Sequence, residues 1–187
     1  MRATQLLKTG DIQTNTLPDP TPGPGDIVVQ VEAAGICGTD RHLFKGEFPS
    51  VPGKVLGHEF SGIVVDANGH DIAEGTRVTC DPNTWCGQCP ACLRGQVNLC
   101  QNNVATGIHR DGGFAEFCAF PAHKAHVLPE ELDPLHGAFC EPLACTIHGM
   151  DIGAARPGER VCVIGGGVIG LMAVALAARA GAEVMLL

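Results

Sequence analysis

The stretch VCVIGGGVIGLMAVALAA, residues 161–178, joins a short apolar run, a glycine-rich turn and a longer apolar segment. The run at 161–165 is continuous, as in a strand that is buried on both faces. The segment 168–180 predicts a helix, and AEVMLL at 182–187 predicts a second strand. The order strand, helix, strand indicates the beginning of an α/β domain with a parallel sheet.

The turn matches the pattern G-x-G-x-x-G through Gly165, Gly167 and Gly170. In dinucleotide-binding folds the first glycine permits a tight turn, the second lets the backbone approach a pyrophosphate, and the third lets the helix pack closely on the sheet. The helix would begin at Val168 and Ile169, where free N–H groups and a partial positive charge favour phosphate. We expect these five residues to bind a dinucleotide; a glycine turn kept only for packing is the alternative.

The expected cofactor is NAD or NADP, with NAD favoured. The acidic residue that would bind the adenosine ribose is expected about 20 residues after the motif, beyond Leu187. The apolar run 161–178 also just reaches the length of a membrane span. Because three glycines lie in its middle, it reads better as a strand followed by a turn and a helix, and we expect no membrane span.

Residues before about 130 follow a different pattern. Short apolar or alternating runs are separated by glycine and proline turns, which is typical of an all-β domain such as a small barrel or sandwich. The predicted strands are 27–37, 60–67, 77–81, 114–120 and 123–128. Asp133 followed by Pro134 predicts the start of a helix, and Pro142 either interrupts that helix or starts a second one.

Composition limits the classes of function. The chain has 187 residues, of which 45% are hydrophobic, enough for one domain or two small ones with a real core. The net charge of −8 argues against a nucleic-acid surface and against anionic lipid, because both require a basic footprint. The N-terminus lacks the apolar segment of a secretory signal, so ten cysteines indicate a reducing compartment, the cytoplasm.

Four of the cysteines lie in CGQCPACLRGQVNLC, residues 86–100. Cys86, Cys89, Cys92 and Cys100 would fill the tetrahedral shell of one zinc ion and leave no position for a substrate. The spacing therefore predicts a structural zinc lobe, with a disulfide loop in a secreted protein as the alternative. Any catalytic metal must be bound elsewhere.

Candidate ligands outside the lobe are few. Cys37 lies in GICGTDRH, His58 and Glu59 lie in LGHEFSG, and Glu141 lies in FCEPLAC. Three such ligands leave a zinc position open for water or an alcohol. Residue types alone leave other interpretations, since single His and Glu residues are often exposed and single Cys residues are often in the core.

These motifs together resemble the zinc-dependent medium-chain alcohol dehydrogenase family. The sequence is similar to the sorbitol (polyol), threonine and 2,3-butanediol dehydrogenase branch, because the liver-type enzymes have cysteine where Glu141 stands. The resemblance implies a GroES-like β domain followed by a Rossmann domain. It is carried, in family order, by the stretches 35–42, 57–65, 86–100, 111–117, 140–149 and 163–170.

The resemblance implies a catalytic zinc on Cys37, His58 and Glu59, with Glu141 as a fourth ligand, directly or through water. A salt bridge is the alternative for Glu141. Zinc would act as a Lewis acid on a secondary alcohol, and hydride would pass to the nicotinamide. The resemblance also implies a proton relay through Thr39 to His42, although an exposed histidine after a metal loop is the other interpretation of His42.

We therefore expect a β-rich GroES-like barrel domain, residues 1–153, followed by the start of an α/β Rossmann domain, residues 154–187. The expected reaction is the oxidation of a secondary alcohol or polyol by NAD(P), with one catalytic and one structural zinc. L-Threonine or 2,3-butanediol is the alternative substrate. A non-catalytic zinc module is one alternative function, but it leaves Cys37 without a role. A zinc-free quinone reductase is another, but it leaves the four-cysteine lobe without a role.

Length affects these expectations. Family members run to roughly twice this chain, a size expected for two domains. We expect a 187-residue piece to bind zinc and to turn over poorly on its own. A small-molecule alcohol is the expected partner, and the full-length protein is expected to form a homo-oligomer, a dimer or tetramer.

Overall fold

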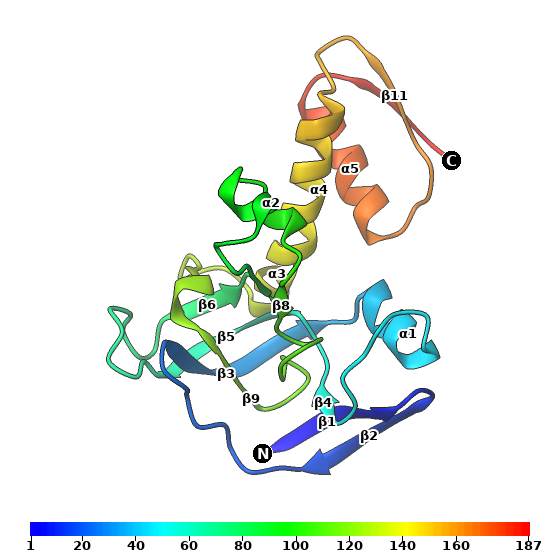
Figure 1. Ribbon diagram of the computed structural model, residues 1–187. Coiled ribbons are helices and arrows are strands. Elements are labelled where there is room, and N and C mark those ends of the chain that lie inside the picture. Colours follow the sequence, from blue (N-terminus) through cyan, green and yellow to red (C-terminus); the bar gives the residue numbers. More distant parts are fainter. The chain divides into compact units, whose positions relative to one another are not determined.

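The computed structural model describes residues 1–187, which form two compact units, Met1–Phe139 and Cys140–Leu187 (Figure 1). The first unit is mainly β-structure, and its helices are short. Its strands are β1 (Arg2–Lys8), β2 (Asp11–Thr16), β3 (Asp26–Gly35), β4 (Lys54–Val55), β5 (Glu59–Asp66), β6 (Arg77–Cys80), β7 (Asn83–Thr84), β8 (Val104–Ala105), β9 (Phe117–Pro121) and β10 (Ala125–Val127).

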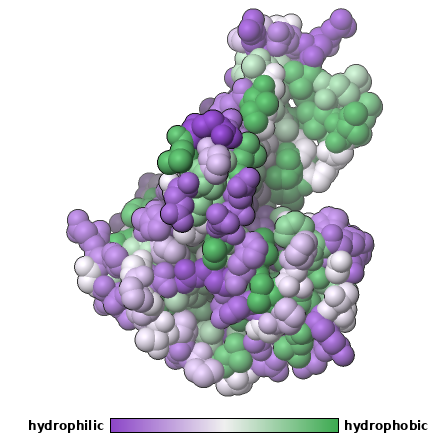
Figure 2. Space-filling view, in the orientation of Figure 1, coloured by the Kyte–Doolittle hydropathy of each residue, from purple (hydrophilic) through white to green (hydrophobic).

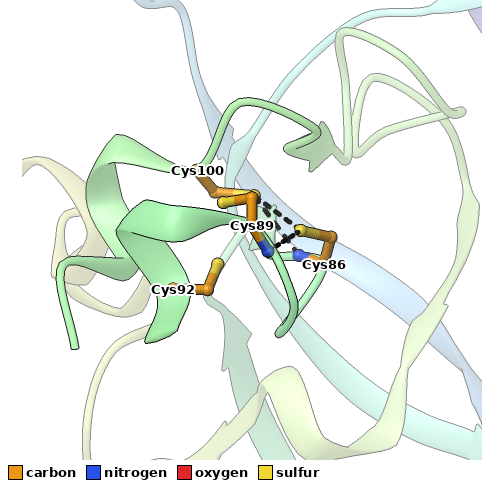
Figure 3. A group of neighbouring side chains, drawn as sticks. All are labelled: Cys86, Cys89, Cys92 and Cys100. Carbon is orange, nitrogen blue, oxygen red and sulfur yellow. Dashed lines mark hydrogen bonds between the residues drawn. The ribbon is translucent and has the colours of Figure 1, made fainter. Parts of the chain in front are cut away.

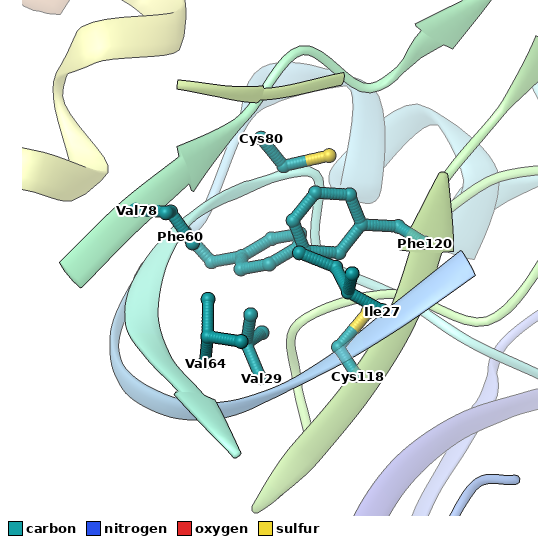
Figure 4. Packing of buried hydrophobic residues seen from close by; sticks show 8 residues of the cluster. All are labelled: Ile27, Val29, Phe60, Val64, Val78, Cys80, Cys118 and Phe120. Carbon is teal, nitrogen blue, oxygen red and sulfur yellow. The ribbon is translucent and has the colours of Figure 1, made fainter. Parts of the chain in front are cut away.

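A five-stranded antiparallel sheet is the centre of the first unit, with strand order β10-β6-β5-β3-β9. One face of this sheet forms the main core, where the rings of Phe60 and Phe120 meet edge to face with centroids 5.6 Å apart. From Val29 to Ala34 of β3, buried or half-buried apolar residues alternate with exposed ones. The core cluster comprises Ile27, Val29, Phe60, Val64, Val78, Cys80, Cys118 and Phe120 (Figure 4).

A second, three-stranded sheet has the order β2-β1-β4 and lies beside helix α1 (Gly38–Lys45). Leu6 from β1, Leu43 from α1 and Leu56 after β4 are fully buried against one another. Burial of each leucine contributes about 1.5–3 kcal/mol. This second cluster therefore holds the loop that carries Cys37 against the N-terminal sheet.

The remaining helical segments of the first unit are short. They are α2 (Pro90–Leu93), η1 (Val97–Leu99), η2 (Ala122–Lys124) and α3 (Pro134–Ala138). Asp133 caps α3 by accepting the N–H of Leu135, as the sequence predicted for this position.

The second unit contains α4 (Cys140–Gly153), β11 (Arg160–Val163), α5 (Val168–Arg179) and β12 (Glu183–Leu186). Strands β11 and β12 are parallel and are joined through α5, a right-handed crossover unit in most proteins. Hydrophobic side chains gather on the visible surface of this unit (Figure 2), and Ile164 is 85% exposed. No helix of either unit has the length and apolar character needed to cross a membrane.

The structure confirms the β-rich region and the strand, helix, strand order that the sequence predicted. Pro142 lies in the first turn of α4, where its missing N–H costs nothing, so it starts a second helix instead of interrupting the first. The strand predicted at 123–128 is shorter than expected, because 122–124 form the 3₁₀ turn η2. The compact-unit division falls at 139/140 and places α4 with the second unit; the domain boundary at 153/154 stays a prediction.

Candidate metal centres

The four cysteines of the lobe converge on one point (Figure 3). The Sγ atoms of Cys89 and Cys100 are 4.0 Å apart, and those of Cys100 and Cys86 are 3.6 Å apart. Four sulfurs about 2.3 Å from a zinc ion form a tetrahedron whose edges are about 3.8 Å. The observed separations match those edges and are far too long for a disulfide, whose sulfurs lie about 2.05 Å apart.

Backbone N–H groups donate hydrogen bonds to these sulfurs and so favour the thiolate form that binds a metal. The N–H of Cys86 donates to the sulfur of Cys100 at 3.3 Å, and the N–H of Cys89 donates to that of Cys86 at 3.4 Å. Backbone donors at Gln88 and Cys89 lower the pKa of Cys86 to about 6. Desolvation and the neighbouring sulfurs raise the pKa of Cys92 to about 12, so metal binding must release its proton.

The lobe is attached to the barrel through a buried cation. The ammonium of Lys124 lies 2.6 Å from a carboxylate oxygen of Asp81 and 3.3 Å from the centroid of the Trp85 ring. Trp85 directly precedes Cys86. The lobe chain is thus held at its first ligand by an ion pair and a cation–π contact. Sequence analysis did not single out these three residues, because Lys124 is far from the lobe in the sequence.

A second cluster consists of Cys37, His58 and Glu59, whose ligand atoms all lie within 4.8 Å of one another. Cys37 is the N-cap of α1, His58 directly precedes β5, and Glu59 is the first residue of β5. Pairing of the end of β3 with the start of β5 brings these positions together. This cluster is therefore assembled by long-range strand pairing, in contrast to the lobe.

The donor set of this cluster fits a zinc ion. Thiolate, imidazole and carboxylate are all zinc ligands, and three protein ligands leave a coordination position for a reactant. The ligand atoms are close enough to share one ion, and His58 is 6% exposed. The four-sulfur lobe has no such position, so chemistry on a bound ion is confined to the Cys37 cluster.

Asp40 supports the cluster of Cys37, His58 and Glu59, and the sequence analysis did not single it out. One oxygen of Asp40 accepts the backbone N–H of Cys37 at 2.9 Å, and the other lies 3.9 Å from Nδ1 of His58. Burial raises the pKa of Asp40 above its usual value, while the Cys37 N–H and the His58 ring act in the opposite direction. The signal in the sequence was an acidic residue at the third position of a helix that begins after Cys37.

The two predicted relay residues lie on one face of α1, at helix positions i and i+3. The hydroxyl of Thr39 lies 3.6 Å from the sulfur of Cys37. The side chain of His42 is 60% exposed, and its Nδ1 lies 2.7 Å from a carboxylate oxygen of Glu47. The His42 hydrogen bond lowers the pKa of Glu47. Their roles as relay members stay predictions.

Glu141 lies in the first turn of α4, in the second unit. Its carboxylate accepts a hydrogen bond from the thiol of Cys145, with 3.5 Å between the sulfur and the oxygen. Its assignment as a fourth ligand stays a prediction.

The glycine turn of the second unit has the features that the motif requires. Gly165 has φ = 104°, which a residue with a side chain rarely adopts. A Cβ at Gly170 would overlap the carbonyl oxygen of Gly165, so this glycine is needed for close packing. Gly167 is the N-cap of α5, which begins at Val168 and Ile169. The first N–H groups of α5 therefore lie next to the glycine turn, where a phosphate can approach the backbone.

Residues 23–130 match the family model described as the alcohol dehydrogenase GroES-like domain. The chain is 41% identical to the L-galactonate-5-dehydrogenase of Escherichia coli K12 over 171 residues, covering 89% of this chain and 49% of that protein. It is 36% identical to a sorbitol dehydrogenase of Halalkalibacterium halodurans over 183 residues, covering 95% of this chain and 53% of that protein.

A crystal structure from Sinorhizobium meliloti 1021, of a protein assigned as a zinc-binding dehydrogenase and bound to NADP, superposes with a TM-score of 0.95. The two sequences are 55% identical, and the match covers 99% of this chain and 55% of that one. The chain spans about half the length of the curated relatives that it matches.

Proposed function

The chain belongs to the zinc-type medium-chain dehydrogenases, with an alcohol dehydrogenase GroES-like domain, and we propose that the protein oxidises a secondary alcohol or polyol to a ketone by hydride transfer to NAD or NADP. The family resemblance predicted from the motifs is confirmed by the matched residues 23–130. The observation that carries the proposal is the cluster of Cys37, His58 and Glu59, a three-ligand set separate from the closed lobe.

Cys37, His58 and Glu59 would hold the catalytic zinc, and Glu141 would complete or assist the ligand set. When bound, this ion supplies Lewis-acid chemistry to an alcohol oxygen. Asp40 supports the ligands from the protein side, because it bonds the backbone of Cys37 and faces His58. A supported ligand set keeps its geometry during the reaction.

Thr39 and His42 would move the proton that the alcohol loses. The hydroxyl of Thr39, beside the sulfur of Cys37, can accept a hydrogen bond from the substrate and donate onward. His42 lies one turn further along α1 and is exposed to solvent, which suits the last member of a relay. With Nδ1 bonded to Glu47, the Nε2 atom of a neutral His42 ring is left as the proton acceptor.

The nucleotide would bind at the second unit. The free N–H groups of Gly167, Val168 and Ile169 would bind the pyrophosphate, with Gly165 and Gly170 providing the turn and the close packing. A related structure holds NADP, and NAD remains the favoured cofactor of this proposal. We also propose a homo-oligomer, a dimer or tetramer.

A polyol is the first choice of substrate. Two relatives act, by their names, on L-galactonate and on sorbitol, which are both polyhydroxylated molecules with secondary alcohols. L-Threonine and 2,3-butanediol are the alternatives. A non-catalytic zinc module would need only the lobe, and the Cys37 cluster would then serve no purpose.

The first experiment is to count zinc per chain in the wild type, in Cys37→Ser and in Cys92→Ser. We expect two zinc ions per chain in the wild type and one in Cys37→Ser, because only the Cys37 cluster loses a ligand. Cys92→Ser is the matched control and should lose the lobe ion. A single ion that Cys37→Ser leaves in place would contradict the proposal and favour the non-catalytic module.

A further inference from the structure

Gly35 lies directly opposite Glu59 in the central sheet. It is the last residue of β3, and Glu59 is the first residue of β5; the two are paired in the antiparallel register. A Cβ built on Gly35 would lie 2.5 Å from Oε2 of Glu59 and 3.3 Å from its Cβ. The carboxylate of Glu59 therefore occupies the space that a side chain at position 35 would need.

Backbone conformation does not explain this glycine. Its φ lies outside the left-handed region, so an alanine could adopt the same backbone. Gly38, three residues further on, provides the contrast, because a Cβ there would meet nothing within 4 Å and its φ is also outside that region. The two glycines flank the same ligand, Cys37, but only Gly35 touches the side chain of another ligand.

We propose that Gly35 is a positioning residue that admits the carboxylate of Glu59 to the metal cluster. A side chain at position 35 would displace the carboxylate of Glu59, one oxygen of which lies within 4.8 Å of the ligand atoms of Cys37 and His58. The cluster would then be left with two protein donors. The inference rests on the proposed function only in that it requires the cluster to bind a metal.

The displaced atom is the end of a flexible side chain, and this decides what Gly35→Ala would do. The carboxylate can rotate away, so the fold should survive while the ligand moves. The metal is expected to bind about 10- to 100-fold more weakly, the range found when a supporting group of a metal ligand is removed. The lobe is built from residues 86–100 and should keep its zinc.

The test compares Gly35→Ala with the matched control Gly38→Ala in the 187-residue chain. Zinc affinity is measured by competition with a chromophoric chelator, and the ligand set is read from the visible absorption of the cobalt-substituted protein. We expect Gly35→Ala to weaken one of two zinc sites about 10-fold or more and to change the cobalt spectrum. Gly38→Ala should behave as the wild type in both measurements.

A double-mutant cycle separates displacement of Glu59 from any other effect. In a Glu59→Ala background the carboxylate is absent, so adding Gly35→Ala should weaken the metal no further. Equal weakening in both backgrounds would overturn the proposal, and so would a Gly35→Ala protein that binds zinc as the wild type does. A wild type with zinc only at the lobe would overturn the proposed function, and this inference with it.

Discussion

Replacing Lys124 with methionine tests how the metal lobe is fixed to the barrel. The Lys124 side chain is 2% exposed and its ammonium contacts Asp81 at 2.6 Å and the face of Trp85 at 3.3 Å. The other carboxylate oxygen of Asp81 accepts the N–H of Asn83, which fixes the turn that leads to Trp85. The backbone N–H of Asp81 also donates to the carbonyl of Lys124. One buried charge thus joins η2 to the first residues of the lobe.

The magnitude follows from what methionine retains and loses. Methionine keeps the apolar stem, so the loss is a charge-assisted hydrogen bond, about 1.5–3 kcal/mol, and a desolvated cation–π contact, about 2 kcal/mol. The variant also avoids the desolvation cost of an ammonium, several kcal/mol. Asp81 is 33% exposed, so its carboxylate can regain water instead of remaining stranded. We expect a net loss of about 2 kcal/mol, below the ~3–5 kcal/mol for breaking a fully buried pair.

Urea unfolding of the zinc-loaded chain, followed by Trp85 fluorescence, measures this loss. The chain has one tryptophan and no tyrosine, so the signal reports on the Lys124 junction alone. Lys54→Met is the control, because the Lys54 side chain is 35% exposed and its ammonium lies 3.8 Å from Asp111, a pair expected to contribute less than about 1 kcal/mol. Zinc removal should shrink the difference between Lys124→Met and wild type. A Lys124→Met protein that unfolds within about 0.5 kcal/mol of wild type would refute the reasoning.

Two further predictions concern titration and tautomer. Burial raises the pKa of the Cys118 thiol from 9.0 to about 12. Between those pH values only the unfolded chain has lost this proton, so the free energy of unfolding falls as the pH rises. In urea unfolding, Cys118→Ala should make this fall shallower by about 1.4 kcal/mol per pH unit, whereas Cys162→Ala, at an exposed thiol, should not. Glu47→Ala should remove the preference of the neutral His42 ring for a proton on Nδ1, which ¹⁵N NMR shifts of the ring report. Lys45→Ala is the control and should leave that preference unchanged. A wild-type ring that carries its proton on Nε2 would contradict the assigned hydrogen bond.

Features that depend on neighbours in the sequence were predictable. The lobe spans 86–100, and its spacing alone brings four sulfurs round one ion. The glycine turn follows its strand and precedes its helix as the motif requires. The N-terminal hairpin of β1 and β2 was not predicted, because its alternating pattern is weak and its residues are largely polar on the exposed side.

Features that depend on tertiary packing were not predictable from the residues themselves. Lys124 would ordinarily be assigned to the surface, since lysine is almost never fully buried unless it is paired. Its partners, Asp81 and Trp85, are about 40 residues earlier in the chain and meet it only because β10 pairs with β6. The role of Asp40 is hidden in the same way, because Asp40 lies in α1 and His58, which approaches it, directly precedes β5.

The Cys37 cluster depends both on sequence motifs and on tertiary packing. Its ligands were proposed from a family resemblance, since the segment of Cys37 and that of His58 and Glu59 have no local spacing rule that connects them. The register of β3 and β5 supplies the connection, because pairing Gly35 with Glu59 sets Cys37 beside the start of β5. A slip of one residue would turn the Glu59 side chain to the opposite face of the sheet. This pairing, in the interior of the five-stranded sheet, therefore assembles the proposed metal site, and the glycine at its end leaves the space that the Glu59 carboxylate occupies.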